Sequence, residues 1–176
     1  FVNNDMQIGL AAPSKSTTYF YKNAEADEML FIHKGEGTLH TMFGSIPFEY
    51  GDYIVIPKGT VYKLELRTSD NRFLFIESFS SIQTPKRYRN EFGQLLEHSP
   101  FCERDIKVPE NLVTYDELGA FDLRIKKQGT IFPYIYENHP FDVVGWDGYE
   151  FPYAFNIKNF ETITGRIHMP PPIHQN

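Results

Sequence analysis

Residues 51–59 read Gly51-Asp-Tyr-Ile-Val-Ile-Pro-Lys-Gly59, and this stretch decides the fold. Gly51 can make the tight turn that follows a strand, because glycine adopts backbone angles that are closed to other residues. The next five residues are aromatic or β-branched apart from one Asp, which favours a strand. Pro57 fixes the start of the next turn, and Gly59 supplies the conformational freedom which that turn needs. The stretch therefore predicts one strand held between two sharp turns.

Turns and short strands alternate on both sides of this stretch. Glycines recur at positions 35, 37 and 44 before it, and Ser69-Asp70-Asn71 follows it. The chain contains 16 Phe and 11 Tyr residues, which prefer strands to helices. Between the turns we predict five strands: Met29–His33, Thr38–Met42, Tyr53–Ile56, Val61–Leu66 and Arg72–Glu77. Short strands at this spacing indicate a mainly β fold, either an antiparallel sandwich or a barrel.

The spacing within residues 51–59 resembles the second motif of the cupin family, in which a metal-ligating histidine follows three positions after the last glycine. That position is Tyr62 here. The first cupin motif places His-x-His before a Glu, and a Gly seven positions after that Glu. Glu28 and Gly35 have this spacing, but the His-x-His positions fall at Tyr21-Lys-Asn23. Metal sites of this kind need imidazoles and a carboxylate that converge. We therefore predict a cupin-type (jelly-roll) β-barrel over residues 19–79 without its metal ligands.

The second half of the chain has a different character. Prolines punctuate the polar residues 80–128, which we interpret as a long irregular connection with one short helical turn near Asn90–Glu97. Residues 129–176 are interpreted as returning strands and a Pro-rich segment, with strands at Gly129–Glu137, Phe141–Trp146 and Phe160–His168. No clean linker interrupts the chain, so residues 1–176 are treated as a single folded unit. Because the chain starts without Met and stops after a Pro-rich stretch, we expect a segment of a longer protein.

Composition limits the classes of partner and the compartment. The net charge is −6 and the pI is near 5.5, whereas a nucleic-acid footprint needs a clustered basic surface. The one basic cluster, Lys86, Arg87 and Arg89, is interpreted as a solvated turn. Cys102 is the only cysteine, which suits a reducing compartment. The sequence also has no apolar run long enough to predict a membrane span. Together these features lead us to expect a cytoplasmic protein that binds neither nucleic acid nor membrane.

Three groups of side chains could carry chemistry. His33 and His40 flank the Gly35–Gly37 turn and are interpreted as half-buried strand histidines. Cys102 lies near His98 and Asp105, and a Cys–His pair can be nucleophilic, but a lone Cys is more often a small buried side chain.

The third group is the stretch His168-Met-Pro-Pro-Pro-Ile-His174, in which three prolines impose an extended course between two histidines. A functional loop at a barrel mouth and a structural loop with solvated histidines both remain open for it.

Several separated stretches resemble the homogentisate 1,2-dioxygenase family. Residues 19–35 are similar to the family pattern Tyr-Arg/Lys-Asn-Ala-x-x-Asp-Glu followed by an apolar strand, and residues 51–60 fit the same family. Residues 140–149 and 153–160 fit it as well, and Gly165-Arg-Ile-His-Met-Pro-Pro-Pro-Ile-His-Gln175 resembles its bacterial branch. The resemblance extends over essentially the whole chain.

The resemblance implies a bicupin whose N-terminal half is this chain and is free of iron. In that family Fe(II) is held in the C-terminal barrel by two His and one Glu, which would lie beyond this sequence. The implied reaction is ring cleavage of homogentisate by O2 to maleylacetoacetate, a step of tyrosine and phenylalanine catabolism. His168 matches the family histidine that accepts a proton near the iron. The resemblance also implies a homo-oligomer, a trimer or hexamer.

Two other classes of function are compatible with the residues taken alone. One is a metal-free cupin that binds a small molecule or builds an oligomer without catalysis, because fold does not decide function. The other is a related iron enzyme that acts on a different aromatic acid. A second cupin carrying His, Glu and His after Asn176 would discriminate the enzyme from the metal-free module.

Overall fold

The fold is mainly β and of the cupin type, as predicted. The computed structural model describes residues 1–143, 148 and 150–161, and their strands form two sheets of six strands each. The first sheet contains, in spatial order, β1 (Met6–Ala11), β8 (Arg72–Ser78), β3 (Asp27–Lys34), β6 (Asp52–Ile56), β12 (Tyr153–Asn156) and β9 (Ile106–Lys107). The second contains β11 (Thr130–Asn138), β10 (Leu118–Lys127), β2 (Phe20–Asn23), β7 (Val61–Leu66), β4 (Gly37–Thr41) and β5 (Gly44–Phe48).

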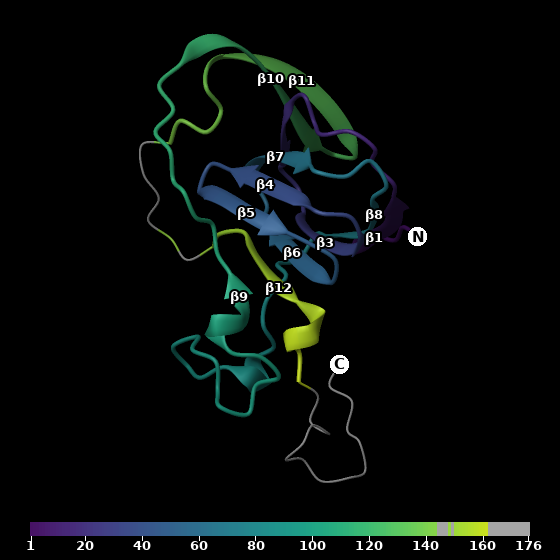
Figure 1. Ribbon diagram of the computed structural model, residues 1–176, viewed down its shortest axis with the longest axis vertical. Helices are drawn as coiled ribbons and strands as arrows, with labels where there is room; N and C mark the ends of the chain where they lie inside the picture. Colours follow the sequence, from purple (N-terminus) through teal and green to yellow (C-terminus); the bar gives the residue numbers. More distant parts are fainter. Residues whose placement is uncertain (144–147, 149, 162–176) are drawn as a thin grey trace.

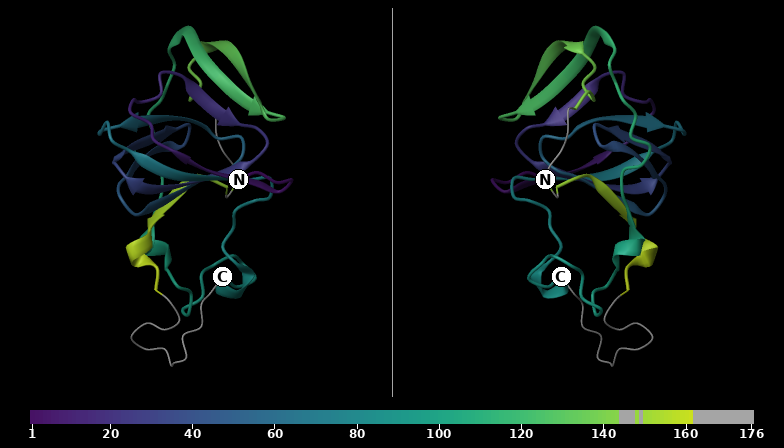
Figure 2. Two further views of the ribbon diagram at one scale, coloured as in Figure 1. Left: turned by 90° about the vertical axis from the view of Figure 1, so that its right-hand side faces the viewer. Right: turned by 90° about the vertical axis from the view of Figure 1, so that its left-hand side faces the viewer.

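The two sheets face each other and share no strand among the described residues, so the molecule is a two-layer jelly roll rather than one closed sheet. Figure 1 shows the long β10–β11 hairpin at one end and the connection between β8 and β9 at the other. The side views of Figure 2 show that both of these parts extend away from the central layers. Three short 3₁₀ helices lie in the described part of the chain: η1 (Lys86–Tyr88), η2 (Glu103–Asp105) and η3 (Ile157–Asn159).

Residues 51–59 form a strand between two turns, as predicted. Gly51 and Gly59 have φ angles of +89° and +88°, a region that favours glycine, and β6 runs between them. β6 lies inside the first sheet, paired with β3 on one side and β12 on the other. The five strands predicted around this stretch correspond to β3, β4, β6, β7 and β8, and their bounds agree within two residues.

The main core lies between the sheets, because the strands alternate inward apolar and outward polar residues. On β7, Tyr62, Leu64 and Leu66 face inward, while Lys63 and Glu65 lie on the opposite face. The buried members of this core are Ile32, Leu39, Ile46, Phe48, Ile54, Ile56, Tyr62, Phe73 and Ala154. A second, smaller cluster of Phe20, Val61, Leu123 and Phe141 covers the outer face of the second sheet.

The prediction for the irregular connection is wrong at its C-terminal end and in its helical turn. Leu118–Lys127 is a ten-residue strand, β10, although residues 80–128 were interpreted as a connection. A register shift between Leu118 and Phe121 interrupts the alternation of inward and outward residues along β10, so the sequence lacks the pattern of a strand there. The helical turn predicted near Asn90–Glu97 is absent there. Instead the Asn90 side-chain Oδ1 accepts hydrogen bonds from the backbone N–H groups of Phe92 and Gln94, and such local bonds compete with a helix.

Of the three later strands that were predicted, one is confirmed. Gly129–Glu137 corresponds to β11. Phe141–Val143 is not a strand, because the Asp142 N–H closes a turn on the His139 carbonyl. Phe160 directly follows η3, and its N–H bonds the Ile157 carbonyl. Glu161 is not in a strand either, and the remaining parts of those two predicted strands, including Trp146 and His168, lie outside the described residues.

Candidate functional site

The side chains at the cupin metal-ligand positions come together between the two sheets. Tyr21 and Asn23 lie on β2, Glu28 on β3 and Tyr62 on β7, as the motif spacing predicts. Tyr21 and Tyr62 are opposite each other in the antiparallel β2–β7 pair, with ring centroids 5.4 Å apart. The Glu28 carboxylate accepts a hydrogen bond from the Tyr62 hydroxyl at 3.0 Å and another from the Asn23 amide at 3.2 Å.

Two further charged side chains complete this cluster, and neither belongs to a sequence motif. Glu77 on β8 is directly opposite Glu28 on β3, so both carboxylates project toward the same face. Lys126 on β10 forms an ion pair with Glu77, and it is aligned with Asn23 in the parallel β2–β10 pair. Both partners of this ion pair are nearly buried. The six residues, Tyr21, Asn23, Glu28, Tyr62, Glu77 and Lys126, are called the inner polar cluster below.

Burial dominates the electrostatics of the inner polar cluster. It raises the pKa of Glu28 from 4.5 to about 7, because the charged carboxylate loses its water; the Asn23 and Tyr62 hydrogen bonds oppose this effect. Burial also raises the pKa values of Tyr62 and Tyr21 well above the usual value for a phenol, and the nearby Glu28 charge raises them further. Both phenols therefore stay protonated and act as neutral groups.

The inner polar cluster does not fit a divalent metal. A ligand set for iron needs imidazoles or several carboxylates with free lone pairs. Here the only carboxylate at the motif positions already accepts bonds from Asn23 and Tyr62, and the tyrosines are protonated phenols. Across residues 1–143, 148 and 150–161, no group of three or more His, Cys, Asp or Glu side chains could hold a metal ion.

The two strand histidines differ from each other. His40 on β4 is half-buried, and its ring bonds the Ser45 hydroxyl at 3.0 Å and the Glu65 carboxylate at 2.7 Å. His33 on β3 is exposed, so its interpretation as half-buried is wrong: it follows the buried Ile32 and lies where the β3–β8 register shifts, at the end of the strand. Neither residue joins the inner polar cluster.

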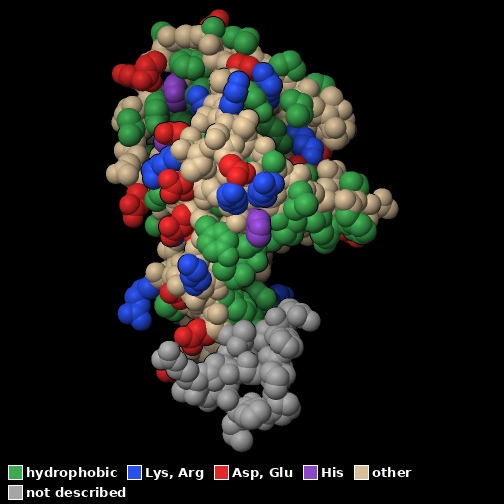
Figure 3. All heavy atoms as spheres, turned by 45° about the vertical axis from the view of Figure 1, so that its right-hand side comes forward, with side chains coloured by type: hydrophobic (Ala, Val, Ile, Leu, Met, Phe, Trp, Pro, Cys, Tyr) green, Lys and Arg blue, Asp and Glu red, His purple; other side chains and the backbone are tan. Residues whose placement is uncertain are grey.

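Cys102 is exposed rather than buried, contrary to the interpretation from sequence. Its N–H bonds the Asp105 carboxylate at 2.9 Å, which caps η2, and His98 is also exposed. The structure shows no bond between Cys102 and His98, so it gives no support to a nucleophilic pair. The basic cluster begins on η1, where Arg87 lies over the Tyr88 ring and Arg89 bonds Gln83. On the face shown in Figure 3, basic and acidic side chains are interspersed.

His168, the catalytic residue implied by the resemblance, lies outside the described residues, and so does His174. Its role therefore stays a prediction. Sequence reasoning marked Tyr21, Asn23, Glu28 and Tyr62 from motif spacing, but only as the positions of metal ligands, of which Glu28 alone is retained. It missed Glu77 and Lys126, because their place in the cluster depends on the β3–β8 and β2–β10 pairings, which have no local signal.

The fold and the inner polar cluster together define a cupin-type domain. In it, hydrogen-bonded side chains stand at the sequence positions where the cupin motifs have metal ligands. Comparison with known proteins gives the family. The family model "Homogentisate 1,2-dioxygenase N-terminal" matches residues 3–157, so the chain belongs to this family.

Two curated relatives agree with this assignment. A Saccharolobus solfataricus protein named "Putative dioxygenase SSO1533" is 46% identical over 155 residues, covering 88% of this chain and 40% of the relative. The homogentisate 1,2-dioxygenase of Bradyrhizobium diazoefficiens is 28% identical over 177 residues, covering 95% of this chain and 38% of the relative. The chain thus spans about two fifths of the length of these curated relatives.

Similarity to solved structures is weaker. A cupin protein from Bacteroides fragilis is 15% identical, with a TM-score of 0.33, and the match covers 47% of this chain and 71% of the other. In the described part of the chain, no helix has the length and apolar character needed to cross a membrane.

Proposed function

We propose that this chain is the N-terminal half of an iron(II)-dependent dioxygenase that cleaves the ring of homogentisate with O2 to give maleylacetoacetate. The observation that carries the proposal is the family match over residues 3–157. The names of both relatives, one a homogentisate 1,2-dioxygenase, support the same class of reaction.

The division of labour within the whole protein follows from the site described above. Because the inner polar cluster does not fit iron, we assign Fe(II) to residues outside this chain and give the described residues a structural part. His168 is proposed as the base that accepts the phenolic proton of the substrate. We further propose a cytoplasmic homo-oligomer, a trimer or hexamer, whose partners are the aromatic acid and O2.

The test uses a protein in which this chain is joined to the further length that its relatives have. With Fe(II) and homogentisate, we expect O2 uptake together with loss of the aromatic absorbance. His168→Ala should lower kcat by about 10²–10⁴-fold, because a positioned acid–base group contributes this much, while iron content stays unchanged. His174→Ala is the matched control, since it changes a histidine of the same Pro-rich segment, and its rate should stay near wild type.

Three outcomes would contradict parts of this proposal. Uptake of O2 with another aromatic acid but not with homogentisate would show that the substrate is wrong. An iron-loaded protein without any O2 uptake would overturn the enzyme assignment. Loss of iron from the His168→Ala variant would make His168 a ligand rather than a base.

One observation favours a second candidate for this half of the protein. The inner polar cluster is hydrogen-bonded within itself and does not fit a metal, which is compatible with a metal-free cupin that binds a small molecule or builds an oligomer. The O2 electrode experiment discriminates the two for the whole protein, because a protein that only binds a small molecule or builds an oligomer consumes no O2 with homogentisate.

A further inference from the structure

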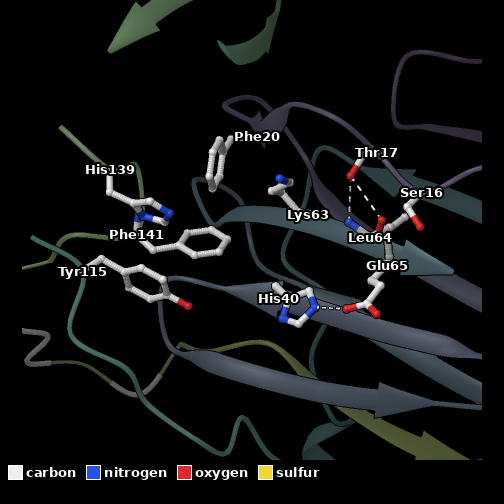
Figure 4. A pocket seen from close by; sticks show the side chains of 10 residues that line it. All are labelled: Ser16, Thr17, Phe20, His40, Lys63, Leu64, Glu65, Tyr115, His139 and Phe141. Atoms are coloured by element: carbon white, nitrogen blue, oxygen red, sulfur yellow. Dashed lines mark hydrogen bonds and ion pairs between the residues drawn. The ribbon is translucent and has the colours of Figure 1, made fainter. Parts of the chain in front are cut away.

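A hollow of about 300 Å³ lies on the outer face of the second sheet, away from the inner polar cluster. It lies between β2, β4 and β7 on one side and the segments around Tyr115 and His139 on the other (Figure 4). The lining residues that matter below are Phe20, Lys63, Glu65, Tyr115, His139 and Phe141. Its volume is at the lower end of the range for small-molecule sites, so it suits a small ligand.

Aromatic rings form one wall of this hollow. Phe20 meets the rings of Phe141 and His139 edge to face, with centroids 5.0 Å apart in both pairs. Tyr115 is stacked on His139 at 4.2 Å, with an interplanar angle of 8°. Figure 4 shows these four rings grouped on the side of the hollow opposite Glu65. Rings held in such fixed edge-to-face and stacked positions offer a planar ligand a preformed apolar surface.

Lys63 supplies a positive charge at this wall. Its Nζ lies over the Phe20 ring, 4.7 Å from the centroid, and within the described residues it forms no ion pair with a carboxylate. Glu65, two positions further on β7, is the nearest carboxylate in sequence that lines the hollow, and it is bonded to His40 Nε2 at 2.7 Å. The hollow therefore contains an ammonium group without an anionic partner of its own.

His139 adds a neutral hydrogen-bond donor. Its Nδ1 accepts the Phe141 backbone N–H at 3.1 Å, so in the neutral ring the proton is on Nε2. Burial lowers the pKa of His139, and Lys63 lowers it further, although Glu117 and Asp142 oppose this. The ring is thus neutral at pH 7, and the structure shows no protein acceptor for Nε2–H in the part of the chain that it describes.

We propose that this hollow binds a small aromatic carboxylate, with the ring against Phe20, Phe141 and Tyr115 and the carboxylate on Lys63. An anion is favoured because Lys63 is the lining cation without a carboxylate partner, and the His139 Nε2–H can donate a second bond. A planar apolar body is favoured because four rings make the wall. The site needs no metal and does not rest on the proposed dioxygenase activity.

The test is an NMR titration of the 176-residue chain with three probes: benzoate, benzamide and cyclohexanecarboxylate. We expect benzoate to shift the amide signals of residues 16–20, 63–65 and 139–141 in a saturable manner. Benzamide keeps the ring and lacks the charge, and cyclohexanecarboxylate keeps the charge and lacks the aromatic ring, so each should bind at least about tenfold more weakly.

Variants at one position separate charge from shape. Lys63→Met should weaken benzoate binding by about tenfold or more, whereas Lys63→Arg should retain it, because the charge remains. Lys127→Met removes an exposed lysine outside the hollow and should leave binding unchanged. Benzoate binding that is equal in wild type and Lys63→Met, or equal binding of benzoate and benzamide, would overturn the proposal. So would the absence of saturable shifts.

The comparison of benzoate with benzamide and cyclohexanecarboxylate uses only the wild-type chain, so it tests the proposed site even if a variant does not fold. O2 uptake plays no part in this readout, so the result is independent of the outcome for the proposed function.

Discussion

At the scale of single residues, Glu28 is a buried carboxyl group with a raised pKa. Its carboxyl lies between the sheets, accepts bonds from two neutral donors and is directly opposite a second carboxylate, Glu77. Lys126 bonds Glu77 rather than Glu28. A buried carboxylate without its own cation favours the protonated form, and this is the physical reason for the raised pKa.

The pKa of Glu28 predicts a pH dependence of stability. The pKa is about 7 in the folded chain, and we take the ordinary value of 4.5 for the unfolded chain. Between these pH values the folded state therefore binds more protons than the unfolded state. The free energy of unfolding should therefore fall as pH rises from about 4.5 to 7, by up to about 3 kcal/mol, and then level off. Glu28→Gln should remove this slope and be the more stable form at pH 8. Urea denaturation of both proteins at several pH values measures these free energies of unfolding.

The control for this prediction is Glu36→Gln, which changes an exposed glutamate after β3 and should keep the wild-type slope. If Glu28→Gln kept the slope as well, another member of the inner polar cluster would be the titrating group.

Motif spacing predicted correctly that Glu28 and Tyr62 lie on strands, because each strand has a glycine turn beside it: Gly35 follows the strand of Glu28, and Gly59 precedes the strand of Tyr62. The exposure of Cys102 and His33 could not be predicted in the same way. Burial of a single side chain depends on which segment packs over it, and no periodic pattern surrounds either residue.

At the scale of elements, Asp52 joins three strands. It is fully buried at the start of β6, and it accepts bonds from Lys107 Nζ of β9 at 2.7 Å and from Asn156 Nδ2 of β12 at 2.9 Å. The Glu49 N–H bonds the same carboxylate at 2.9 Å. One side chain thus attaches the long connection and the last strand to the centre of the first sheet.

This arrangement predicts that Lys107→Met lowers the free energy of unfolding by about 1–3 kcal/mol, because the buried Asp52 carboxylate loses its lysine donor and keeps only neutral ones among the described residues. Lys58→Met, at an exposed lysine just after β6, should change stability by less than about 0.5 kcal/mol. Urea denaturation of the two variants compares them. Equal stabilities would show that β9 contributes nothing to the fold through Asp52.

The strands that sequence reasoning found, β3, β4, β6, β7, β8 and β11, are close to recognisable turn residues. It missed β1, β2, β5, β9, β10 and β12, and for β10 and β12 the pairing shows why. β12 has four residues and is defined by its pairing with β6 and β9, and β10 has an interrupted alternation and pairs with β2 in parallel. Such strands are specified by distant partners, so a local pattern contains little information about them.

At the scale of the whole molecule, the β10–β11 hairpin exposes an unusual amount of apolar surface. Every residue of β11 is exposed, and Ile131, Phe132, Tyr134, Ile135 and Tyr136 are among them, with exposures between 40% and 67%. Pro133 lies in the same strand, and a proline on an edge strand removes one backbone donor. Exposed apolar surface on an edge strand promotes association of chains.

We therefore predict that Ile135→Lys reduces the concentration-dependent light scattering of this chain. The melting temperature should stay within about 2 °C of wild type, because the side chain is 67% exposed and contributes little to the core. Thr130→Lys, at the start of the same strand, adds the same charge without removing apolar surface and serves as the control. Equal scattering of Ile135→Lys and wild type would show that this hairpin does not drive association.

The parallel pairing of β10 with β2 has a consequence for the order in which the chain folds. Phe20 pairs with Leu123 and Asn23 with Lys126, so β2 remains without a neighbour on that side until most of the chain exists. During synthesis, the strands from β3 to β8 can pair with one another early, whereas the second sheet is completed only after Leu118–Lys127 has emerged. Contacts between such distant residues form slowly because of the entropy of closing the intervening loop. In refolding experiments, backbone amides of β2 should therefore become protected from hydrogen exchange later than those of β3 and β6.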